Sequence, residues 1–194
     1  GLRLTSASAP AVRNNTFAAN RLSAIDLEAN GFPIIEGNNA YSNGINGIRV
    51  SGTIGSGAWS ANLPYVPQQN LVVETGNTLT LPAGVVVKLS ASRSFIVRGA
   101  LNASGTLTNP VVFTSLYDDT YGGDTQQNGP ASKANPGDWG TIYFADTSDD
   151  TASVLDQVVV RYGGAEYYYG SGTATADLVL DSAAPPVRNS RFEH

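Results

Sequence analysis

Short apolar–polar–apolar triplets recur along the first third of the chain. LRL at 2–4, IDL at 25–27 and IRV at 48–50 fall into one frame when the sequence is shifted by 23 residues. Such a triplet is the period-two pattern of a short strand that buries one face. The pattern therefore predicts units of about 23 residues, each made of very short strands joined by turns.

Turn residues are abundant, with 21 Gly and 10 Pro in the chain, and no apolar stripe with the helical period is visible. One unit of short strands cannot bury its own inner face, so each unit has to stack on the next. We therefore expect an all-β chain that forms a parallel β-helix, a solenoid whose coils hold about 23 residues.

Interruptions of the strand pattern divide this single expected domain, residues 1–194. Prolines 64 and 67 disfavour central strand pairing, and Asp, Gly and Tyr gather in two later loops. Solenoids often carry function in loops of unequal length. The expected order is regular coils at 1–57, a crossing loop at 58–70, coils at 71–115, an Asp- and Gly-rich insertion at 116–138, and coils at 139–194 with a Tyr-rich loop at 163–173.

Asparagines recur at matching positions of successive units. Stacked Asn side chains can form an amide ladder along a solenoid. They can equally be turn residues that tolerate the left-handed backbone conformation. Both interpretations apply to Asn14, Asn15, Asn38, Asn39 and Asn189.

The sequence PAVRNNTF at 10–17 returns as PPVRNSRF at 185–192. The chain could span slightly more than one period of a longer repeat, so that its two ends are compatible. Alternatively, the motif is a generic coil sequence, as a partial match at 33–41 indicates. Since a solenoid exposes unpaired backbone groups at both ends, we expect end-to-end stacking on other copies or on neighbouring repeats.

Composition narrows the possible partners and the location. The net charge is −5 and the 11 Lys and Arg form no basic cluster, which argues against nucleic acid and anionic membrane surfaces. No apolar run reaches the ~20 residues of a membrane span. Without Met, the chain is expected to be a processed product or a segment of a longer protein. Few lysines and no Cys favour an extracellular or cell-surface location.

Oxygen-bearing side chains alternate in DTQQNG at 124–129, and two more aspartates lie just upstream. Alternate oxygen ligands followed by a glycine turn are typical of a calcium loop. The alternative is a solvated polar loop. The candidate calcium ligands are Asp118, Asp119, Asp124, Gln126 and Asn128.

A run of tyrosines stands out in the second polar loop. Aromatic faces stack on sugar rings and also make protein contacts, or they cover an open edge of the solenoid. All three roles stay open for the residues of this group. These are Tyr162, Glu166, Tyr167, Tyr168 and Tyr169.

The order of LTLPAGVVVKL, FIVRGALNASGT, GDWGTIYF and LDQVVVRYGG resembles the right-handed parallel β-helix regions of large bacterial cell-surface and secreted proteins, of the pectate-lyase-like superfold. The resemblance covers roughly residues 63–192. It implies a right-handed solenoid and a location outside the cell, whereas it implies little about activity.

Enzymes of this superfold that cleave pectin need a carboxylate cluster with a histidine, or a basic residue beside bound calcium. The one histidine is His194, and Arg98 and Arg161 have no acidic cluster on their strands. We therefore expect a non-enzymatic extracellular module: a filament subunit, adhesin stalk or spacer. The alternative is a carbohydrate-binding or polysaccharide-cleaving β-helix, which a groove shared by the Tyr and Asp loops would favour.

Overall fold

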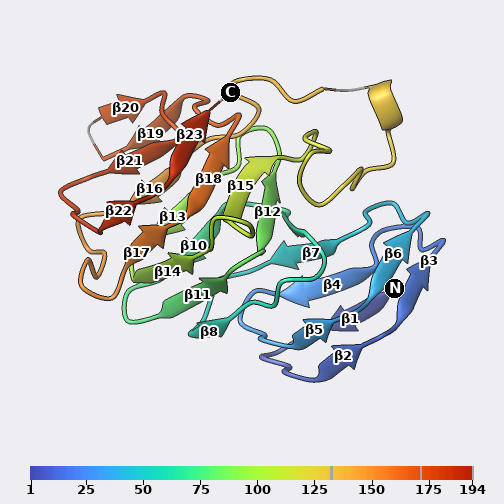
Figure 1. Ribbon diagram of the computed structural model, residues 1–194. Coiled ribbons are helices and arrows are strands. Elements are labelled where there is room, and N and C mark those ends of the chain that lie inside the picture. The colour runs from blue at the N-terminus through green and yellow to red at the C-terminus, as the bar shows by residue number, and fades with distance from the viewer. Residues whose placement is uncertain (132, 171, 194) are drawn as a thin grey trace.

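Parallel strands of two to five residues make up most of the ordered elements in this chain. The computed structural model describes residues 1–131, 133–170 and 172–193. Within them, one short 3₁₀ helix, η1 (Gly129–Ala131), is the only helical element. Figure 1 shows the strands stacked from the N-terminal end to the C-terminal end.

The longest sheet, called here the long sheet, has eight parallel strands in the described part of the chain. Its neighbours are never consecutive in sequence, because the chain leaves the sheet after each strand and returns one coil later. In order, its strands are β1 (Leu2–Leu4), β4 (Ile25–Glu28), β7 (Ile48–Ser51), β9 (Tyr65–Pro67), β12 (Val86–Leu89), β15 (Val111–Ser115), β18 (Val158–Arg161) and β23 (Arg191–Glu193).

Two further parallel sheets form the other sides. The four-stranded sheet contains β10 (Leu71–Val73), β13 (Phe95–Val97), β16 (Ile142–Phe144) and β21 (Leu178–Leu180). The five-stranded sheet contains β22 (Val187–Arg188), β17 (Val154–Asp156), β14 (Ala100–Ser104), β11 (Thr78–Pro82) and β8 (Gly57–Ala58). From β10 onward the chain visits the four-stranded, five-stranded and long sheets in a constant order, so the all-β parallel solenoid is confirmed.

The N-terminal coils carry two smaller parallel pairs in place of these sheets. β2 (Ala11–Arg13) pairs with β5 (Ile34–Glu36), and β3 (Thr16–Ala18) pairs with β6 (Asn39–Tyr41). One antiparallel hairpin, β19 (Tyr167–Tyr169) and β20 (Gly172–Ala174), lies within and just beyond the expected Tyr-rich loop.

The strand register confirms the frame that the triplets predict. Leu2 pairs with Ile25, and Ile25 pairs with Ile48, each 23 residues further on. Later coils are uneven, since Val111 pairs with Val158, which is 47 residues away. That longest interval contains the insertion at 116–138.

Residues 58–70, expected to be a crossing loop, contain the central strand β9. Pro67 occupies the last position of this strand opposite Val50. Proline has no N–H there, and the next residue supplies the donor: Gln68 N donates to the Val50 carbonyl at 2.9 Å. Trp59 stacks on Tyr65 with ring centroids 4.1 Å apart, and both are buried.

The core consists of apolar columns that run through successive coils. Along the long sheet, each residue of one column faces the next in register. Parallel strands that are in register place identical faces above one another, so one inward position per coil suffices. The column is Leu2, Ile25, Ile48, Tyr65, Val87, Phe113, Val160 and Phe192.

An asparagine ladder joins three N-terminal coils. Asn15 Nδ2 donates to Asn38 Oδ1 at 3.0 Å, and Asn38 Nδ2 donates to Asn62 Oδ1 at 3.2 Å. A second ladder starts where Asn20 Nδ2 donates to Asn43 Oδ1 at 2.6 Å. The ladder interpretation therefore holds for Asn15 and Asn38.

The turn interpretation holds for other asparagines. Asn14 and Asn189 have positive φ of 56° and 49°, the left-handed conformation. Each follows a strand end whose arginine pairs with an acidic residue of the next coil, Arg13 with Glu36 in one case. The repeated VRN motif thus encodes a corner between strands. Gly37 has the same role in the partial match, with φ of 62°.

Candidate functional site

The root of the insertion is a buried polar cluster on the outer face of the long sheet. Asp118 is 3% exposed. The Thr114 hydroxyl donates to its Oδ2 at 2.7 Å, Arg161 Nη1 lies 3.3 Å from the same oxygen, and Thr120 N donates to Oδ1 at 3.0 Å. Asp118 therefore holds the insertion against two strands of the solenoid.

Lys88, on β12, is fully buried beneath the insertion. Its Nζ donates to the carbonyls of Asp118 at 2.9 Å and Gly123 at 2.5 Å. Burial lowers the pKa of Lys88 to about 8, although the carboxylate of Asp119, the largest of three opposing charges, favours the ammonium form. This amine satisfies two loop carbonyls that would otherwise be buried without partners.

Arg161, on β18, links the insertion to the last coil. It forms an ion pair with Glu193 at 3.1 Å, and its Nη2 donates to the Tyr162 hydroxyl at 2.9 Å. Its guanidinium also lies 4.8 Å from the Tyr162 ring centroid and 5.5 Å from that of Tyr121. Its side chain is 14% exposed, so these contacts are shielded from water.

The expected calcium loop is ordered by its own hydrogen bonds. Asp124 accepts the backbone N–H of Asn128 at 3.1 Å and of Gly129 at 2.8 Å. Gln126 Oε1 accepts Asn128 Nδ2 at 3.4 Å. Partial burial, and next the nearby Asp124 charge, raise the pKa of Asp119.

Two of the five expected ligands can thus supply adjacent negative charge, Asp119 and Asp124, whereas Asp118 is turned toward Thr114 and Arg161. Across the described residues, no group of three or more His, Cys, Asp or Glu side chains has the arrangement of a metal site. Calcium binding in this loop stays a prediction.

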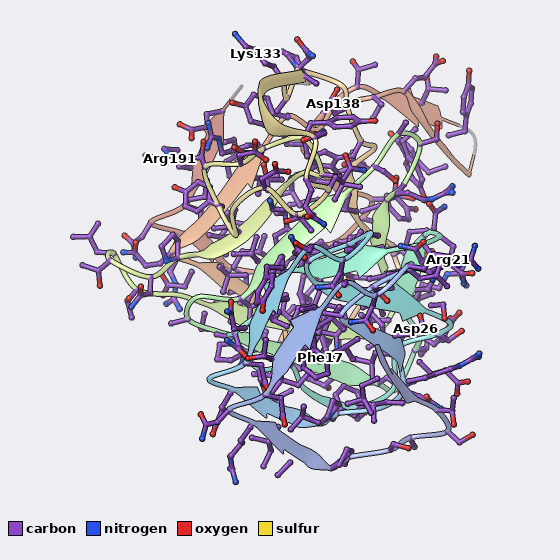
Figure 2. All side chains as sticks on the ribbon, turned by 90° about the vertical axis from the view of Figure 1, so that its right-hand side faces the viewer. Phe17, Arg21, Asp26, Lys133, Asp138 and Arg191 are labelled. Carbon is purple, nitrogen blue, oxygen red and sulfur yellow. The ribbon has the colours of Figure 1, made fainter. Side chains whose placement is uncertain are left out.

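The insertion also reaches back along the stack. Asn46 N donates to the Thr125 carbonyl at 2.8 Å, and the Gln127 amide donates to the Asn43 carbonyl, 84 residues away in sequence. Thr125 is fully buried. The insertion therefore braces the N-terminal coils against the middle of the solenoid. Figure 2 shows its later part, with Lys133 and Asp138, at the end of the stack opposite Phe17.

The tyrosine hairpin covers the outer face of the four-stranded sheet. Val72, Ile96, Tyr143 and Val179 form one outward apolar row in register. The side chains of Tyr167 and Tyr169 pack on this row, their centroids 5.3 and 5.4 Å from Tyr143. Structural cover thus accounts for these two tyrosines.

Tyr168 points the other way, as alternation along a strand requires. It is 70% exposed, and its hydroxyl donates to Glu166 at 2.7 Å. Figure 1 shows the hairpin at one side of the stack and η1 of the insertion at the other.

A cavity of about 580 Å³ lies between the hairpin and the ends of three strands. The hairpin supplies Tyr167–Gly170, and the four-stranded sheet with its following residues supplies Glu74, Thr75, Arg98, Tyr143, Ala145, Asp146 and Thr147. Tyr162 instead lines a separate cavity of about 380 Å³ with Asp118 and Asp119. The two loops therefore do not share one groove.

Sequence reasoning missed Glu74, Arg98 and Asp146 as neighbours of the tyrosines. Their common signal is position, because each closely follows a strand of the four-stranded sheet. Finding it required the register of Val73, Val97 and Phe144, which uneven coil lengths hide.

The C-terminal end of the solenoid leaves its core open. Phe192, Val187 and Leu180 are 42%, 37% and 42% exposed, and each ends a column of a different sheet. The residues below them in register, Val160, Leu155 and Phe144, are fully buried. At the opposite end, Leu4 and Val12 are only 7% exposed.

No family model, no curated protein and no solved structure matches the chain. Among the residues that the structure describes, no helix has the length and apolar character needed to cross a membrane.

Proposed function

We propose that the protein is a non-enzymatic structural module located outside the cell or on its surface. It is a right-handed parallel β-helix with coils of about 23 residues and two loop insertions, and it stacks end to end as a filament subunit, adhesin stalk or spacer. The observation that carries the proposal is the open core at the last coil, where Leu180, Val187 and Phe192 are exposed.

A further coil on this end would bury the exposed parts of these side chains. Full burial of such a side chain is worth about 1.5–3 kcal/mol, so the three exposed parts contribute about 2–3 kcal/mol in all. Backbone pairing along the free edge of β23 adds to this, in the manner of strand addition. Association of separate molecules costs at least ~4 kcal/mol in lost freedom.

These magnitudes support weak stacking of separate copies and strong stacking of adjoining repeats. Two copies in one chain meet at a high effective concentration, which removes most of the association cost. The free edge of β1 is the partner surface, because it is the other unpaired edge of the long sheet. The repeated VRN corner has no part in this argument, since such corners occur within the stack as well.

The separation of the two loops supports a non-enzymatic role. A cleaving enzyme needs acid and base groups on both sides of one bond. The Tyr hairpin and the Asp insertion line different cavities. His194, the candidate histidine, lies outside the described residues. Calcium in the 118–129 loop belongs to this proposal as an ion that would stiffen the insertion.

The test compares one copy with two copies joined head to tail. We expect the joined chain to unfold at a higher urea concentration than the single copy, and to lose that gain when Val187→Lys and Phe192→Glu are placed at the junction. Leu107→Lys is the control, because Leu107 is 85% exposed on a loop away from the end. Equal urea midpoints for the single and joined chains would refute stacking.

A further inference from the structure

The cavity under the tyrosine hairpin has an aromatic wall held in place by the fold. The Tyr143 ring is 9% exposed, and its hydroxyl donates to Asp181 Oδ2 at 2.7 Å. Tyr167 and Tyr169 stand parallel within 12°, with centroids 6.4 Å apart. Their orientation is fixed by packing on Tyr143, so the wall is formed before any ligand arrives.

Polar groups face this wall from the strand ends. Arg98 Nη1 donates to both carboxylate oxygens of Glu74, at 3.3 and 3.2 Å, and the two side chains are 49% and 40% exposed. Asp146 and Thr147 line the same cavity. A planar guanidinium beside carboxylates presents donors and acceptors within reach of one another.

The charges of the cavity select against anions. Glu74 and Asp146 carry two negative charges and Arg98 one positive charge, so an acidic sugar or a phosphate would meet a surplus of like charge. An apolar peptide would cover the same three groups without giving them hydrogen-bond partners, which is unfavourable. A neutral polyhydroxylated ring satisfies both sides, because it has hydroxyls for the charged groups and an apolar face for the tyrosines.

We propose that this cavity binds a short segment of a neutral saccharide. Its volume of about 580 Å³ lies within the range of ligand sites, ~300–1,000 Å³. Tyr168, 70% exposed at the rim, offers a further ring face beyond the cavity. The site is independent of the proposed stacking, since none of its residues lies on the last coil's open core.

The experiment titrates the protein with short neutral gluco- and manno-oligosaccharides, and with oligogalacturonate as the acidic comparison, by calorimetry and saturation-transfer NMR. We expect saturable binding of a neutral oligosaccharide, with NMR contacts to tyrosine protons, and no binding of oligogalacturonate. Arg98→Ala and Tyr168→Ala should each weaken binding by about tenfold or more.

Two matched variants serve as controls. Arg13→Ala removes an ion pair of the same kind between neighbouring coils, Arg13 with Glu36 at 2.8 Å. Tyr41→Ala removes a tyrosine that is 50% exposed on β6. Both should bind like the unmodified chain. The proposal is overturned if no neutral oligosaccharide binds, if only oligogalacturonate binds, or if the cavity variants and the controls lose affinity equally.

Discussion

Lys88 makes the stability of this protein depend on pH in a predictable way. The buried amine has a pKa of about 8 in the folded chain and 10.5 as its ordinary value. Below pH 8 it is protonated in both states, and the full penalty of burying the ammonium is present. Between pH 8 and 10.5 the unfolded chain binds more protons than the folded chain, so stability rises with pH.

The size of the effect follows from the two pKa values. One pKa unit corresponds to about 1.36 kcal/mol, so the penalty is about 3.3 kcal/mol at pH 7 and about 0.8 kcal/mol at pH 10. Lys88→Met keeps the chain length of the side chain and removes the titrating group. The unfolding free energy of the unmodified protein minus that of the variant should therefore increase by about 2.5 kcal/mol from pH 7 to pH 10.

Urea unfolding at several pH values, followed by the fluorescence of the buried Trp59 and Trp139, measures this difference. Taking the difference cancels the titration of other groups, such as the tyrosines. The exposed Lys133, replaced by Met, is the matched control and should give a flat difference. A flat or falling difference for Lys88→Met would show that this amine is not held in a desolvated site.

Two further predictions concern the N-terminal coils and the insertion. Asn38→Ala should lower the unfolding free energy by about 2–3 kcal/mol in urea titrations, because it breaks the ladder and leaves the Val12 carbonyl without its Asn38 donor; Asn39→Ala, an exposed neighbour, should change it by less than about 0.5 kcal/mol. Calcium added to metal-stripped protein should release heat and raise the melting temperature, and Asp124→Asn should reduce both effects; no heat and no thermal shift in the unmodified chain would contradict calcium binding.

The regular features of the fold could be predicted because a period leaves a trace in the sequence. The pairing of LRL, IDL and IRV follows from one inward position per coil, and the ladder of Asn15 and Asn38 follows from the same frame. Strand β9 was missed because Pro67 was expected to end strand pairing, whereas the proline sits where its missing N–H is replaced by that of Gln68.

The irregular features had no such trace. Lys88 lies in a strand-like run, and its burial depends on an insertion that folds back over it. The neighbours of the tyrosines come from strands separated by coils of different length, so spacing alone could not bring Arg98 and Tyr169 together. Long-range contacts made by non-repeating loops need the three-dimensional structure.

The brace between Gln127 and Asn43 changes how the molecule should come apart. A stack whose units touch only their neighbours can melt one unit at a time from either end, like a zipper. Here the second coil is also tied to a loop that leaves the solenoid only after β15, so the N-terminal coils cannot peel away without releasing that loop. The consequence is cooperative unfolding from the N-terminal side, while the other end, with its open core, is free to fray or to add the next unit.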